Sequence, residues 1–206
     1  SNVGSHNVTL RVTDETVNID QEFDILVVNN NTPPSFTSSP IISINEDEEY
    51  VYSIGTSDID GDEVSISDIE KPDWLSFNYI SGNTSASLTG LPDNSDVGTH
   101  SVIIRVSDGI EFTDQEFGIT VSNTNDNPEF TSTPITDAEV GLEYKYTVTA
   151  EDIDLNDVLT FSSTGLPSWL NFNTNTQTLS GTPGINDIGN HSITLRVNDG
   201  LVLIDQ

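Results

Sequence analysis

The chain of 206 residues has no cysteine and only five lysine and arginine residues. No apolar run approaches the roughly 20 residues of a membrane span. The absence of cysteine excludes a disulfide framework, zinc–thiolate sites and thiol catalysis. Because 34 acidic residues give a formal net charge of −29, the chain repels nucleic acid and anionic lipid. We therefore expect neither a nucleic-acid partner nor direct membrane insertion of this segment.

The acidic composition has two explanations that are compatible with each other. Negative surface charge favours solubility in a salty or extracellular medium. Clustered carboxylates also bind hard cations such as calcium. The hydrophobic residues, 33% of the chain, are mostly Val, Ile, Leu, Phe and Tyr, which suit half-buried strands.

Three segments of the chain have similar sequences. S-N-V-G-S-H-N-V-T-L-R-V-T-D (1–14) returns as S-D-V-G-T-H-S-V-I-I-R-V-S-D-G (95–109) and as N-D-I-G-N-H-S-I-T-L-R-V-N-D-G (186–200). The motif W-L-x-F occurs twice, at Trp74 and at Trp169. Such self-similarity at a period of about 90 residues predicts an array of tandem domains.

The repeats divide the chain into three parts. We interpret residues 1–30 as the C-terminal hairpin of a first repeat, 31–126 as a complete second repeat, and 127–206 as a third repeat that lacks its last strand. Gln206 aligns with Gln115, after which the second repeat continues E-F-G-I-T-V-S-N. We expect the chain to be a window from a longer array. A further hypothesis is that Glu22 to Val28 completes the third repeat of a neighbouring chain by strand addition.

Within the repeats, hydrophobic residues alternate with polar ones. Tyr50, Tyr52 and Ile54 follow this period of two, as do Phe117 and Ile119. Alternation between short turns predicts antiparallel strands with one buried face. The predicted fold is all-β, with tandem immunoglobulin-like sandwiches of about seven strands each.

Two loops contain aspartates at alternate positions, which can direct several carboxylates toward one point, as calcium requires. An EF-hand is excluded because position 12 of each loop is Ile69 or Ser163 instead of glutamate. A solvated turn with hydrogen bonds from the aspartates to the backbone is the alternative. The loops contain Asp58, Asp60 and Asp62, and Asp152, Asp154 and Asp157.

The join between the second and third repeats reads N-T-N-D-N-P-E-F (123–130) and resembles the cadherin interdomain linker D-x-N-D-N-x-P-x-F. In cadherins this linker shares calcium ions with a D-x-D loop, a strand-end aspartate and acidic residues of the preceding domain. The resemblance implies a calcium site at this second join. Its implied ligands are Glu46, Asp93, Asn125, Asp126, Asn127, Asp152, Asp154 and Asp199.

The sequence also departs from classical cadherins, whose L-D-R-E motif is replaced by L-P-D-N (91–94) and T-P-G-I (182–185). W-L-x-F and S-G-T-P are more similar to the dystroglycan-type cadherin-like repeats, also called Putative Ig repeats of bacterial surface adhesins. The first join, N-N-N-T-P-P-S-F (29–36), has Thr32 in place of the linker aspartate. We expect weaker calcium binding there, or none. The implied ligands of this first join are Asn31, Asp58, Asp60 and Asp108.

The sequence does not favour an enzyme. His6, His100 and His191 recur two residues after a turn glycine, which indicates packing or a turn more than catalysis. The repeated arginines are expected to pair with a neighbouring acid, and no G-x-S-x-G motif is present.

The leading hypothesis is a calcium-stabilised structural or adhesive segment of a large extracellular or cell-surface protein, of bacterial origin. Its expected partners are other repeats of the same protein, and a homotypic or carbohydrate ligand at the cell surface is the further option. The alternative is a carbohydrate-binding module that accompanies a polysaccharide-active enzyme. Exposure of the Trp74 or Trp169 indole would favour this alternative, whereas burial would place both rings in the cores.

Overall fold

The computed structural model describes residues 3–155 and 157–206, so the first two residues of the predicted hairpin segment 1–30 lie outside it. Its contacts divide the chain into two compact units. The first unit contains residues up to 44 together with 49–91 and 99–120. The second unit contains the third repeat with 121–126, and also the loop segments 45–48 and 92–98 of the second repeat.

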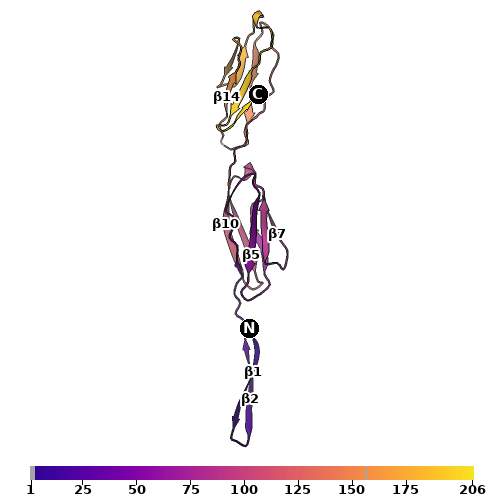
Figure 1. The fold of residues 1–206 in the computed structure, drawn as a ribbon, viewed down its shortest axis with the longest axis vertical. Coiled ribbons are helices and arrows are strands. Elements are labelled where there is room, and N and C mark those ends of the chain that lie inside the picture. The colour runs from indigo at the N-terminus through magenta and orange to yellow at the C-terminus, as the bar shows by residue number, and fades with distance from the viewer. Residues whose placement is uncertain (1–2, 156) are drawn as a thin grey trace. The chain divides into compact units, whose positions relative to one another are not determined.

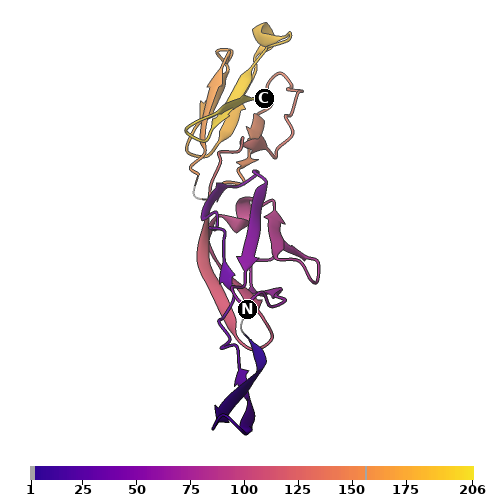
Figure 2. The same ribbon diagram turned by 60° about the horizontal axis from the view of Figure 1, so that its bottom comes forward.

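The chain begins with an antiparallel hairpin of β1 (Gly4–Thr13) and β2 (Asn18–Val27) (Figure 1). Asp14 closes its turn, because Oδ1 accepts hydrogen bonds from the backbone N–H groups of Thr16 and Val17. The two strands twist around each other (Figure 2), as isolated two-stranded ribbons do. Every residue of β2 is exposed, so the hairpin has no core of its own.

The second repeat is a sandwich of two four-stranded sheets, with the orders β3-β5-β8-β7 and β4-β10-β9-β6. Tyr50, Tyr52 and Ile54 are buried at alternate positions of β5, as the period of two predicted. They pack with Leu88 and Ile104 in the core. The strands are β3 (Ser35–Phe36), β4 (Ser43–Asn45), β5 (Tyr50–Ser57), β6 (Ser65–Glu70), β7 (Leu75–Tyr79), β8 (Ser85–Gly90), β9 (Gly98–Ser107) and β10 (Phe112–Ser122).

The third repeat has the same plan with shorter strands, in sheets β11-β13, β12-β16-β15 and β14-β17-β18. Its core contains Tyr146, Val148, Leu179 and Leu195. His191 lies before β17 and outside it. The strands are β11 (Glu129–Phe130), β12 (Tyr144–Thr147), β13 (Ala150–Glu151), β14 (Thr160–Thr164), β15 (Leu170–Asn173), β16 (Thr178–Gly181), β17 (Thr194–Asn198) and β18 (Leu203–Asp205).

The tryptophans occupy equivalent places in the two repeats. Trp74 packs against the second core and lies edge-on to Tyr50 and His100, and Trp169 lies edge-on to Tyr144 and His191. Both indoles are half-buried, and their Nε1 atoms are buried without a hydrogen-bond partner. Both histidines thus pack against an indole ring, and His191 Nε2 also donates a hydrogen bond of 2.8 Å to the backbone carbonyl oxygen of Asp187.

The repeated arginines each form a two-pronged ion pair with an aspartate on the adjacent strand. Nε and Nη2 donate to the two carboxylate oxygens at 2.6–2.8 Å. This confirms the pairing expected from the sequence. The pairs are Arg11–Asp20, Arg105–Asp114 and Arg196–Asp205.

Candidate metal centre

The loop that follows β13 gathers three carboxylates. One oxygen of Asp152, of Asp154 and of Asp157 lies within 4.8 Å of the other two. The loop folds in this way because Asp152 Oδ1 accepts a hydrogen bond of 3.0 Å from the backbone N–H of Asp154. The other oxygen of Asp152, Oδ2, is buried and has no hydrogen-bond partner.

The linker binds directly to this loop. The backbone N–H of Asp126 donates to Asp154 Oδ2 at 2.7 Å. Asn125 Nδ2 donates to Asp199 Oδ2 at 3.0 Å. Asp199 Oδ1 in turn accepts the N–H groups of Leu201 and Val202, both at 2.6 Å, which fixes its carboxylate after β17. The linker, the D-x-D loop and the strand-end aspartate therefore form one network.

Two side chains of the second repeat belong to the same compact unit. Glu46 follows β4 and is fully buried. Its Oε1 accepts a hydrogen bond of 2.6 Å from the backbone N–H of Thr124, whereas Oε2 is buried without a partner. Asn94 Nδ2 donates to Asp126 Oδ2 at 2.9 Å and to Asp154 Oδ1 at 3.1 Å.

The structure thus connects five of the predicted ligands to one another by hydrogen bonds, and a sixth, Glu46, accepts a hydrogen bond from the linker backbone at Thr124. Asn94 was not predicted, and the only sequence signal was its place beside Asp93 in L-P-D-N. Asp93 Oδ1 instead accepts hydrogen bonds from Ser95 N and Oγ and begins the 3₁₀ turn Asn94–Asp96. The side chain of Asn127 is exposed. The five connected residues are Asn125, Asp126, Asp152, Asp154 and Asp199.

The carboxylates of this cluster repel each other. The pKa of Asp157 is raised, first by desolvation and then by the charges of Asp152, Asp154 and Asp199. The pKa of Asp199 is lowered, chiefly by the hydrogen bonds from Val202 N–H and Asn125. The arginines that form ion pairs in the described residues do so with aspartates of hairpin strands, outside this cluster.

The chemistry of the donors fits calcium. A hard cation of this kind takes 6–8 oxygen ligands from carboxylates, amides and carbonyls. A buried carboxylate oxygen without a partner is costly, because its desolvation is not compensated. Glu46 Oε2 and Asp152 Oδ2 are two such oxygens in the second unit.

At the first join the linker contacts the D-x-D loop and the strand-end aspartate, as it does at the second join. The backbone N–H of Thr32 donates to Asp60 Oδ2 at 2.8 Å, and Asn31 Nδ2 donates to Asp108 Oδ2 at 2.9 Å. Asp58, Asp60 and Asp62 also gather within 4.8 Å, and Asp58 Oδ2 is buried without a partner. Thr32 cannot supply the carboxylate that Asp126 brings to the second join.

The third repeat has no counterpart of Glu46 or of Asn94. Val140 and Ile185 occupy these two positions, so the third repeat offers neither the carboxylate nor the amide.

The sequence profile of the Putative Ig domain family matches residues 33–124 and residues 127–203. These two tandem copies account for most of the chain, so the chain belongs to this family, and the resemblance found in the sequence is confirmed. A comparison with curated proteins finds no relative.

Solved structures of cadherin domains share the fold. Protocadherin gamma B2 extracellular cadherin domains 1–5 match with 17% identity and a TM-score of 0.59, over 99% of this chain and 44% of that chain. Human protocadherin-24 EC1-2 matches with 18% identity and a TM-score of 0.51, over 85% of this chain and 94% of that chain. The predicted all-β, tandem immunoglobulin-like fold class is confirmed.

The endo-fucoidan hydrolase MfFcnA4 from glycoside hydrolase family 107 matches with 25% identity and a TM-score of 0.41 over 100% of this chain. This chain spans about a third of the length of the fucoidan hydrolase chains that it matches. In the part of the chain that the structure describes, no helix is long and apolar enough to cross a membrane.

Proposed function

We propose that the chain is a calcium-stabilised structural or adhesive repeat segment of a secreted or cell-surface protein. The observation that carries this proposal is Glu46, a fully buried glutamate with one oxygen on the linker and the other without a partner. A buried carboxylate with nothing to compensate it would destabilise the fold, and a bound cation would supply that compensation. We therefore interpret Glu46 as a cation ligand. Family membership and the cadherin fold support the proposal.

The residues of the second join would act as follows. Asp126, Asp152, Asp154 and Asp199 supply carboxylate oxygens from the linker and the third repeat, and Glu46 supplies one from the second repeat. When bound, calcium supplies the positive charge that these carboxylates lack. Because calcium would bind the folded state and not the unfolded chain, its binding free energy would stabilise the folded state. In this proposal the repeats 31–126 and 127–206 are the structural units, and calcium restrains the linker between them.

The test is thermal unfolding of the 206-residue chain by calorimetry, in calcium and in chelator. The proposal predicts a higher melting temperature in calcium and a loss of this increase in Asp152→Asn. Asp68→Asn, an exposed acid on β6, is the matched control and should keep the increase. A melting temperature that calcium does not change would contradict the proposal.

The contacts of the two tryptophans argue against the alternative, a carbohydrate-binding module. Such modules present exposed aromatic side chains to the sugar, whereas Trp74 and Trp169 pack against the two cores with their Nε1 atoms buried.

A further inference from the structure

The N-terminal segment of the second repeat crosses from one sheet of the sandwich to the other. Its first strand, β3, pairs with β5 through Ser35 and Phe36, whereas its second strand, β4, lies beside β10 in the other sheet. A segment that changes sheets in this way forms a corner of the sandwich. Because β3 has two residues and β4 has three, few backbone hydrogen bonds hold the segment. The side chains at the corner therefore decide how firmly it is attached.

Ser38 lies at this corner and is bound by side chains of both sheets. Its Oγ lies 2.8 Å from the hydroxyl of Tyr52 on β5, and its carbonyl oxygen accepts a hydrogen bond of 3.1 Å from Gln115 Nε2 on β10. The Tyr52 hydroxyl donates to Gln115 Oε1 at 2.8 Å. The three residues thus form a closed ring of hydrogen bonds, which we call the serine–tyrosine–glutamine ring.

The hydrogen bonds of this ring have a determined direction. The Tyr52 hydroxyl has one proton and gives it to Gln115 Oε1, so Ser38 Oγ must donate to the Tyr52 oxygen. The Gln115 amide then closes the ring, because its Nε2 donates to the Ser38 carbonyl oxygen. Tyr52 is only 3% exposed, so loss of one member would leave polar groups in the interior without a partner. A buried polar network in which every member is satisfied makes the surrounding structure rigid.

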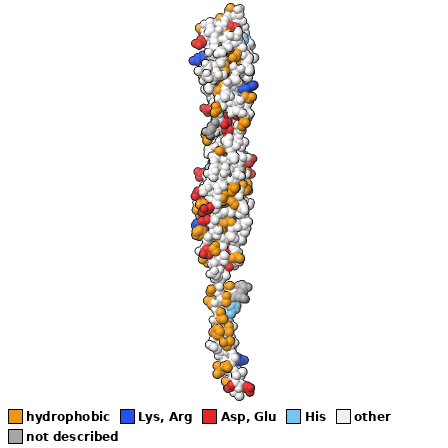
Figure 3. All heavy atoms as spheres, turned by 90° about the vertical axis from the view of Figure 1, so that its left-hand side faces the viewer, with side chains coloured by type: hydrophobic (Ala, Val, Ile, Leu, Met, Phe, Trp, Pro, Cys, Tyr) orange, Lys and Arg blue, Asp and Glu red, His pale blue; other side chains and the backbone are white. Residues whose placement is uncertain are grey.

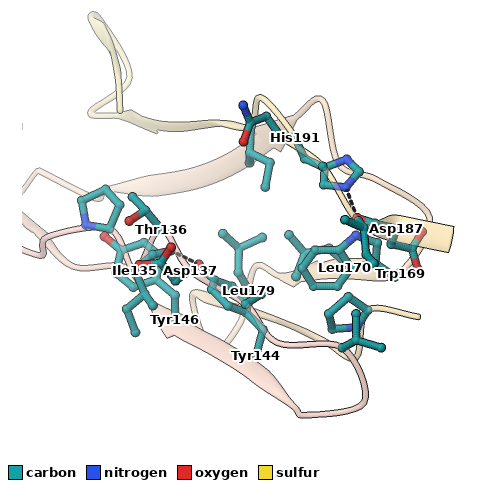
Figure 4. A pocket seen from close by; sticks show the side chains of 18 of the residues that line it. Ile135, Thr136, Asp137, Tyr144, Tyr146, Trp169, Leu170, Leu179, Asp187 and His191 are labelled. Atoms are coloured by element: carbon teal, nitrogen blue, oxygen red, sulfur yellow. Dashed lines mark hydrogen bonds between the residues drawn. The ribbon is translucent and has the colours of Figure 1, made fainter. Parts of the chain in front are cut away.

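The third repeat contains the same ring. Ser132 Oγ lies 2.7 Å from the Tyr146 hydroxyl, which donates to Gln206 Oε1 at 2.9 Å. Gln206 Nε2 donates to the Ser132 carbonyl oxygen at 2.8 Å. A second tyrosine, Tyr144, holds the same segment by donating to the carbonyl oxygen of Ile135 at 2.7 Å (Figure 4). The ring thus belongs to the common plan of the repeats.

The ring lies where tension on a repeat would act. The linker before the second repeat leads into the segment that contains Ser38, and β10, which contains Gln115, leads into the linker after it. A pull on the two linkers therefore loads the contacts between this segment and β10. We propose that the serine–tyrosine–glutamine ring sets the tension that each repeat withstands before it unfolds. This proposal rests on the structural role proposed above and not on calcium.

The ring contains no carboxylate and no basic side chain, whereas the chain has 34 acidic and five basic residues. Figure 3 shows Asp and Glu side chains at several places along one face, with few Lys and Arg side chains. The candidate metal centre consists of other residues. The ring should therefore resist tension in chelator as well, and an experiment in chelator tests it separately from the metal site.

The test is the substitution Tyr52→Phe, which removes one hydroxyl group from the ring. Tyr79→Phe is the matched control, because the Tyr79 hydroxyl donates to Val64 O at 3.1 Å in the same repeat, away from the N-terminal segment. Optical tweezers hold the 206-residue chain at constant force in chelator. The second repeat is recognised by its longer extension step, since the two family matches cover 33–124 and 127–203. Tyr52→Phe should shorten its folded lifetime about tenfold more than the control does.

Hydrogen exchange without force separates an effect on the corner from a general loss of stability. The N–H of Gly55 donates to Ser38 Oγ at 2.9 Å, so its exchange rate reports the opening of the corner. Tyr52→Phe should accelerate exchange at Gly55 several-fold more than at the amides of β8, the other neighbour of β5. Ser38→Ala should also shorten the lifetime under force, although it leaves both tyrosines intact. Equal lifetimes of Tyr52→Phe and Tyr79→Phe, or equal acceleration at Gly55 and β8, would overturn the proposal.

Discussion

Asn94 Nδ2 lies 3.1 Å from Asp154 Oδ1, although 60 residues separate the two in the sequence. The same nitrogen donates to Asp126 Oδ2 at 2.9 Å. One amide thus lies between two carboxylates that would otherwise repel each other. The oxygen and nitrogen of an amide are nearly equal in shape, so a rotated Asn94 would present its oxygen to a cation in the same place. We infer that Asn94 bridges the cluster without calcium and serves as a ligand with it.

Substitution of Asn94 should separate these two roles. Asn94→Ala removes an oxygen ligand and should weaken calcium binding by about tenfold or more. Asn94→Asp places a negative charge next to the carboxylates of Asp126 and Asp154. The variant should therefore lower the melting temperature in chelator and increase the stabilisation by calcium. Calorimetric unfolding in both conditions measures this, with Asn83→Asp in an exposed turn as the control. Equal behaviour of the two aspartate variants would disprove the role of Asn94.

Replacement of Glu46 by glutamine should have opposite effects in the two conditions. The Gln side chain can still accept the hydrogen bond from Thr124 N–H, while the buried charge disappears. Without calcium, Glu46→Gln should raise the melting temperature, because an unpaired buried carboxylate is costly. With calcium, the variant should be less stable than the wild type. A variant that is destabilised equally in both conditions would indicate a purely structural role.

Gly181 should tolerate no side chain. A Cβ atom at this position would overlap the backbone carbonyl oxygen of Trp169, and Gly90 has the same relation to Trp74. Gly181→Ala should therefore destabilise the third repeat by about 1–3 kcal/mol, as overpacking does. Gly184→Ala in the same repeat is the control, because its Cβ would be 3.5 Å from the nearest atom. Urea unfolding of both variants measures the difference. If they unfold alike, the close approach of the chains is not what requires glycine in this motif.

The Arg105–Asp114 pair predicts a pH-dependent contribution to stability. The hydrogen bond from Arg105 lowers the pKa of Asp114. A lowered pKa means that the stabilisation is present above the unfolded pKa of about 3.9 and is lost as the pH falls through the folded value. Asp114→Asn should therefore lower the melting temperature at neutral pH, and the difference from wild type should shrink below about pH 4.

This measurement belongs in chelator, with Asp68→Asn as the reference. The cluster at the second join is then common to all three proteins and cancels from the comparison. A difference between Asp114→Asn and wild type that is the same at neutral and acid pH would contradict the assignment to the ion pair.

Much of the fold could be predicted from the sequence, because alternate side chains of a strand that lies over a core point into that core. Tyr50, Tyr52 and Ile54 are buried as their spacing indicates. The boundaries of β17 could not be predicted in the same way. His191 and Ile193 have the same sequence pattern as His100 and Val102, yet only the latter pair is in a strand. Whether a segment forms a strand depends on the strands that pair with it. The sequence around His191 and Ile193 does not specify which strand pairs with that segment.

Prediction of the candidate site from the sequence has the same limit. Alternate aspartates and the linker motif pointed to Asp152, Asp154 and Asp126, and the structure connects these residues in one network. The sequence also pointed to Asp93, whose acidity matched the expected chemistry, whereas Asn94 makes the contacts. The choice depends on the direction of one 3₁₀ turn, which places adjacent side chains on different sides. Residue type alone cannot determine this direction.

The central claim, calcium at the second join, is tested most directly by isothermal titration calorimetry. Calcium is titrated into the wild type, Asp152→Asn and Asp58→Asn, which are equivalent changes at the second and first joins. We expect saturable binding to the wild type, a loss of affinity of about 10–100-fold at the strongest site in Asp152→Asn, and little change there in Asp58→Asn. No saturable binding to the wild type, or an equal effect of both substitutions, would contradict the account.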